Sequence, residues 1–120
     1  MSDSMRVSSQ RYGPLLDAWQ KFVERQLGPL LWEPRADSEI VDGGAVRVGP
    51  VAGSGVAMGG VDVDEFREEL NAFLERYGFA PGKFQATPGG YLELATSDRS
   101  GAEFTMRARG RILAWVLVRP

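Results

Sequence analysis

Residues 61–79 read VDVDEFREELNAFLERYGF, and this is the stretch with the clearest local pattern in the chain. Asp62 is placed to cap the first turn of a helix, and Gly78 to end it in a left-handed conformation. Apolar side chains recur between them at helical spacing: Phe66, Leu70, Phe73, Leu74 and Tyr77. The stretch therefore predicts an amphipathic helix with one face packed against a core.

A second amphipathic helix is predicted upstream, opening at Gly13-Pro14 and ending at Gly28-Pro29. Its apolar positions are Leu15, Leu16, Trp19, Phe22, Val23 and Leu27. Residues 1–10 are polar and rich in serine, so we expect a disordered lead-in, either native or added in cloning. A single folded domain then covers residues 11–120.

The segment between the two helices has the weakest pattern. Two short strands, at residues 39–41 and 45–48, are expected around an Asp-Gly-Gly turn. Residues 49–60 are rich in glycine and predict a mobile loop, or a bulged edge strand around residues 56–58. Gly53, Gly55 and Gly59 match neither the dinucleotide fingerprint nor the phosphate-binding loop, so no cofactor is predicted there.

After the central helix, apolar and polar residues alternate. This pattern predicts strands at residues 83–86, 91–96, 104–109 and 112–118, which short turns make antiparallel neighbours. The last of them is apolar on both faces, as is typical of a strand inside a sheet or covered on both sides. The predicted fold is α+β, in the order α-β-β-α-β-β-β-β, with two amphipathic helices packed on one face of a mostly antiparallel sheet as a two-layer sandwich.

Composition excludes several kinds of active site. The chain has no cysteine and no histidine, so it lacks thiol nucleophiles, imidazole bases and the usual zinc ligands. Asp62, Asp64 and Glu65 are too few for a calcium loop and are accounted for by helix capping, so no metal is predicted. The net charge of −2 gives no preference for nucleic acid. No apolar run approaches the roughly 18 residues of a membrane-spanning helix.

Arginines gather near the last predicted hairpin. A surface of this kind suits a carboxylate, a phosphate or an acidic partner, and the alternative is a solvated face that protects the sheet from aggregation. Trp19 and Trp115 fall inside apolar patterns typical of a core, whereas Trp32, between two prolines, is a candidate for a pocket rim. The candidate partner surface consists of Arg99, Arg107, Arg109, Arg111 and Arg119.

The second half of the chain contains Tyr77-Gly78-Phe79, then Tyr91-Leu92-Glu93-Leu94, then residues 98–104 (DRSGAEF), and closes with an apolar strand. This arrangement resembles small actinobacterial cell-envelope lipoproteins of the LppA type, over roughly residues 12–119. The resemblance implies export to the cell envelope and brings no catalytic residues with it. The chain departs from the family in lacking the lipobox cysteine and the paired cysteines.

These observations predict a non-enzymatic binding domain, the soluble part of an exported envelope protein, whose partner is another protein or a small anionic ligand. One alternative is a cytoplasmic immunity or antitoxin-like protein; another is a small enzyme that uses only carboxylates and arginines, such as Glu93 and Glu103. A native start at Met1 would favour the cytoplasm, and a removed leader an extracytoplasmic location. A homodimer through an exposed final strand or a flat apolar face stays open.

Overall fold

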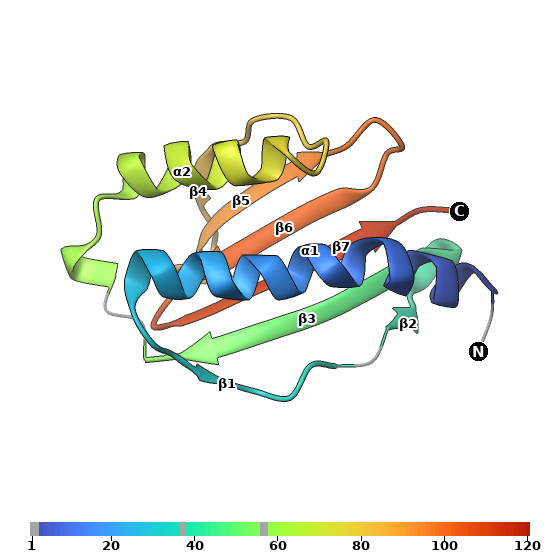
Figure 1. Ribbon diagram of the computed structural model, residues 1–120, viewed down its shortest axis with the longest axis horizontal. Coiled ribbons are helices and arrows are strands. Elements are labelled where there is room, and N and C mark those ends of the chain that lie inside the picture. The colour runs from blue at the N-terminus through green and yellow to red at the C-terminus, as the bar shows by residue number, and fades with distance from the viewer. Residues whose placement is uncertain (1–2, 37, 56–57) are drawn as a thin grey trace.

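The computed structural model describes residues 3–36, 38–55 and 58–120, in which two helices cover one face of a seven-stranded antiparallel sheet (Figure 1). The elements are α1 (Asp3–Leu27), β1 (Leu31–Trp32), β2 (Glu39–Ile40), β3 (Val46–Ser54), α2 (Val63–Glu75), β4 (Phe84–Ala86), β5 (Leu92–Ser97), β6 (Glu103–Ala108) and β7 (Arg111–Val118), with 3₁₀ turns at Asp42–Gly44 and Met58–Gly60. The strand order is β1-β3-β7-β6-β5-β4, and β2 also pairs with β3. The predicted α+β class and the closing four-strand meander are confirmed.

Helix α2 forms as its local sequence predicts. The carboxylate of Asp62 accepts a hydrogen bond of 3.1 Å from the amide three residues on, which satisfies a donor of the first turn. At the other end Gly78 has φ 88°, and the amide of Phe79 donates to the carbonyl of Leu74 at 3.1 Å. The buried face of the helix consists of Phe66, Leu70, Phe73 and Leu74.

Helix α1 begins at Asp3, well before the predicted start at Gly13-Pro14. The prediction of a disordered lead-in is therefore wrong for residues 3–10, which form the first turns of this helix. Tertiary packing explains the difference, because Ser8 and Tyr12 are only 6% and 4% exposed. Pro14 lies inside the helix, where its missing amide usually disfavours helical structure, and burial of the turns on both sides of it offsets that cost.

The core fills the space between the helices and the sheet. Phe22 of α1 stacks on Phe73 of α2, with ring centroids 5.1 Å apart and planes inclined by 27°. Trp19 of α1 is fully buried, and so are Phe104 and Met106 on the helix-covered face of β6. The two helices thus contact each other as well as the sheet, which fixes the layer that they form.

The prediction of a mobile loop at residues 49–60 is wrong for residues 49–54, which belong to β3. This strand pairs with β7 on both sides of an irregularity between Val48 and Val51. Gly49 adopts φ 95°, a conformation that favours glycine. Gly53 lies beneath the indole of Trp32, where a side chain would clash with the ring. The edge strand predicted around residues 56–58 falls largely outside the described residues, which resume with the 3₁₀ turn at Met58–Gly60.

Replacing Gly53 by alanine is expected to destabilise the fold by about 1–3 kcal/mol, as overpacking of a filled site does. A Cβ there would come within 2.9 Å of Cε3 of Trp32, closer than carbon atoms approach in a packed core. Urea unfolding measures the effect. Gly59→Ala is the control, because a Cβ on Gly59 meets nothing within 4 Å. Equal stability of the two variants would contradict the packing of Trp32 on β3.

Candidate functional site

The two faces of the sheet differ in what covers them. Both helices lie on the side that faces the viewer in Figure 1, where Ile112, Ala114 and Val116 of β7 are fully buried. The alternate residues of β7 point to the opposite side, which we call the outer face, and they are Leu113, Trp115 and Leu117. These three are only partly buried, because no helix of the described residues lies over them. Strand β7 is internal, as its sequence predicts, yet the described part of the chain covers one face of it.

Charged side chains surround this apolar column of the outer face, and several of them are paired with one another. Arg107 donates from Nε to Glu93, and Arg111 forms an ion pair of 2.7 Å with Glu33. The guanidinium of Arg107 also lies 5.3 Å from the ring centroid of Trp115, a cation–π contact. The outer face therefore has an apolar centre and a rim whose charges largely neutralise each other.

The five arginines predicted as one partner surface do not gather in one place. Arg107 and Arg111 lie on the outer face in the ion pairs just described, and Arg109 donates to the carbonyl of Gly89. Arg99 lies in the turn before β6, at the other end of that strand from Arg107, and Arg119 is exposed beyond the end of β7. The sequence shows that these five residues carry positive charge. It does not show that Arg107 and Arg111 form ion pairs with the carboxylates of Glu93 and Glu33.

Trp32, the predicted pocket rim, packs into the edge of the core. Its ring lies 6.0 Å from that of Trp19, in an edge-on arrangement, and over Gly53. Trp32 does not line the cleft between α1, the end of α2 and the turn after β5. The site that the sequence suggested at this residue is therefore a packing contact between β1, β3 and α1.

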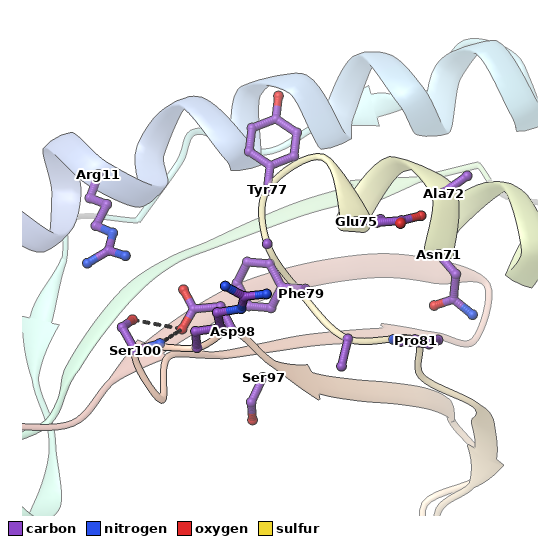
Figure 2. A pocket seen from close by; sticks show the side chains of 13 residues that line it. Arg11, Asn71, Ala72, Glu75, Tyr77, Phe79, Pro81, Ser97, Asp98 and Ser100 are labelled. Atoms are coloured by element: carbon purple, nitrogen blue, oxygen red, sulfur yellow. Dashed lines mark hydrogen bonds between the residues drawn. The ribbon is translucent and has the colours of Figure 1, made fainter.

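A cleft with a volume of about 890 Å³ lies between the first half of α1, the end of α2 and the turn after β5. Figure 2 shows Arg11, Asp98 and Ser100 toward one end of it and Glu75 and Asn71 toward the other. The charged side chains that line it are Arg11, Glu75, Asp98 and Arg99. Two positive and two negative charges give the cleft no clear preference for an anion.

Asp98 at this cleft is engaged by four donors. The hydroxyl of Tyr12 donates to Oδ2 at 2.6 Å; the amide and hydroxyl of Ser100 donate to Oδ1 at 2.9 and 2.7 Å, and the amide of Ala102 at 3.0 Å. Burial opposes ionisation of Asp98, but these hydrogen bonds outweigh it and hold its pKa below the ordinary value of 3.8. Burial and the bond to Asp98 raise the pKa of Tyr12. The group is a clamp that ties α1 to the turn before β6, and none of its members is poised as a general base.

The clamp makes stability depend on pH. The pKa of Asp98 is lower in the folded state than in the unfolded state. Its ionised carboxylate therefore adds to the free energy of unfolding above about pH 4, and this stabilisation is lost as the pH falls through the folded pKa. We expect Asp98→Asn to cost about 1–3 kcal/mol at neutral pH and progressively less below pH 4. Urea unfolding at several pH values checks this, with Asp64→Asn on the exposed surface of α2 as control. A cost that does not vary with pH would contradict the clamp.

The carboxylates considered for catalysis are not brought together. Glu93 lies opposite Arg107, and Glu103 lies opposite Ser97, four residues further along β5. At the rise of a strand this separation is roughly 13 Å, too far for the two to act on one bond. Among the described residues no group of acidic side chains is arranged to hold a metal ion, and no helix there has the length and apolar character needed to cross a membrane.

Comparison with models of protein families, with curated proteins and with solved structures finds no match to this chain. The proposals that follow therefore rest on the geometry of the outer face.

Proposed function

We propose that this chain is a non-enzymatic interaction domain that binds a protein partner through the outer face of its sheet. The observation that carries the proposal is strand β7, which is apolar on both faces while the described helices cover only one. Contiguous apolar surface on a soluble domain usually marks an interface, because burying it is worth roughly 25 cal/mol per Å². The outer face has such a surface at its centre, built from Leu113, Trp115 and Leu117.

The composition of the outer face also suits a protein partner. Binding energy at interfaces is concentrated in a few residues, with tryptophan and arginine over-represented among them, inside a polar rim. Trp115 with Arg107 over its ring, in the centre of paired charges, has this arrangement. Leu31 of β1 lies on the same face through its pairing with Ser54 and is 77% exposed, outside the rim formed by Arg111 and Glu33.

A small anionic ligand is less well supported by the same contacts. Arg107 and Arg111 are held by carboxylates of the chain itself, and the arginines of the cleft are balanced by Glu75 and Asp98. A bound carboxylate or phosphate would have to share these arginines with their internal partners or displace them. A protein surface that covers Trp115 requires no such exchange.

The resemblance to LppA-type envelope proteins adds a location to the proposal, in which the domain faces the extracytoplasmic side of the membrane. The genomic sequence upstream of Met1 tests this part. An apolar leader ending in a cysteine would support it, and an untranslated upstream region would remove it. A toxin gene beside this one would instead favour the immunity alternative.

Capture experiments with tagged protein test the proposed surface. We expect the wild-type chain, but not Trp115→Lys, to retain a specific partner from an extract of the source organism. Tyr77→Lys is the matched control, because Tyr77 is a 40% exposed aromatic residue on the helix side of the molecule. Capture of the same proteins by Trp115→Lys, with its circular dichroism unchanged, would refute binding through the outer face.

A further inference from the structure

One row of the outer face carries opposite charges on its two sides. Leu117 of β7 lies opposite Arg47 of β3 on one side and opposite Glu103 of β6 on the other. Residues directly opposite in antiparallel strands point to the same face, so these three side chains share the outer face. The row therefore reads positive, apolar, negative across the strands β3, β7 and β6.

We propose that the partner covering the outer face is a second copy of this chain, and this inference rests on the proposed function. The two sheets stack face to face, with a two-fold axis that runs along β7 between them. Such a rotation places β7 over its counterpart and exchanges the two sides of the row. Arg47 of each copy then faces Glu103 of the other, while Leu117 and Trp115 meet their own equivalents.

The ion pairs within the chain favour this partner. The side chain of Glu103 forms no ion pair or hydrogen bond with the described residues, although it is partly buried beside β7. Arg47 uses Nη2 to bind Glu39, and its planar guanidinium carries further donors for a second carboxylate. A two-fold axis across β7 would instead set Glu103 over Arg107, which Glu93 and the ring of Trp115 already hold. The stack along β7 thus places Glu103 opposite Arg47, which Glu39 alone holds, rather than opposite Arg107, which has two contacts of its own.

Sedimentation of the full chain over a range of concentrations tests the inference. We expect the wild type to sediment as a dimer of the 13.1 kDa chain at high concentration. Glu103→Arg and Arg47→Glu should each weaken self-association by at least about tenfold, because each places like charges opposite one another across the interface. Mixed in equal amounts, the two variants should form a heterodimer, since both cross-interface pairs then regain opposite charges. Circular dichroism confirms that each variant is folded.

The outcomes separate this inference from the proposed function. A wild-type chain that stays monomeric, while Trp115 still governs capture of a different protein, overturns the second copy as partner and leaves the outer face as the binding surface. A dimer that neither charge reversal weakens, or variants that fail to associate when mixed, overturns the stack along β7. Restoration of the dimer only in the mixture supports both proposals.

Discussion

Phe73→Asp is expected to unfold the domain completely. The ring of Phe73 is 4% exposed and stacks on Phe22, so the replacement places a carboxylate between the two helices. Loss of a buried phenylalanine costs about 3–5 kcal/mol, and burial of an unpaired charge adds several more. Together these losses approach the 5–15 kcal/mol that stabilises a typical domain. Far-UV circular dichroism and the dispersion of amide NMR signals measure the result.

The neighbouring residue provides the control. Ala72 lies on the exposed side of the same helix turn, so Ala72→Asp adds the same charge without entering the core. We expect that variant to stay folded, with a stability within about 1 kcal/mol of the wild type. A folded, cooperative Phe73→Asp protein would show that α2 packs through a different face.

Trp19→Ala should destabilise the chain far more than Trp115→Ala. Trp19 is fully buried between α1 and the sheet and contacts Trp32, so its removal leaves a cavity and costs about 3–5 kcal/mol. Trp115 is partly exposed on the outer face, and its loss removes only partial burial and the contact with Arg107, about 1–2 kcal/mol. Urea unfolding of the two variants, monitored by circular dichroism, gives both values.

This comparison also bears on function, because it asks whether Trp115 serves the fold. A small cost for Trp115→Ala means that the indole contributes little to folding and is available for binding. Equal costs for the two replacements would show that the outer face belongs to the folding core, and the interface proposal would then lose its main support.

Local sequence patterns sufficed for the elements that local interactions decide. Asp62 and Gly78 mark the ends of α2 through hydrogen bonds within a few residues, so its limits were predictable. The alternation in β5 to β7 likewise predicted the meander, because short turns leave neighbouring strands no other simple arrangement. Tyr77, predicted on the buried face of α2, lies just after the helix and is 40% exposed.

Contacts between distant residues decided the rest. The start of α1 looks disordered by composition, and it is anchored by Tyr12, whose hydroxyl binds Asp98, 86 positions away. The glycines of β3 look like a loop until the indole of Trp32 is seen above Gly53. Neither partner could be recognised from the local sequence, which is why these two regions were predicted wrongly.

The candidate surface shows the same division. The apolar character of β7 on both faces was visible in the sequence, but only the structure shows which face the helices leave uncovered. The arginines were visible in the sequence too. Their ion pairs were not, because Glu33, the partner of Arg111, lies 78 positions away. The sequence therefore indicated charge near the last hairpin. The candidate interface that we propose from the structure is instead the apolar column of Leu113, Trp115 and Leu117 between those charges.

Photo-crosslinking from single positions in living cells tests the central claim most directly. A photoreactive phenylalanine analogue at Leu113, on the outer face, is compared with the same residue at Ala72, on the exposed side of α2. The interface proposal predicts a discrete crosslinked product from Leu113 and none from Ala72. Products from Ala72 alone, or the absence of any product from Leu113 in folded protein, would contradict it.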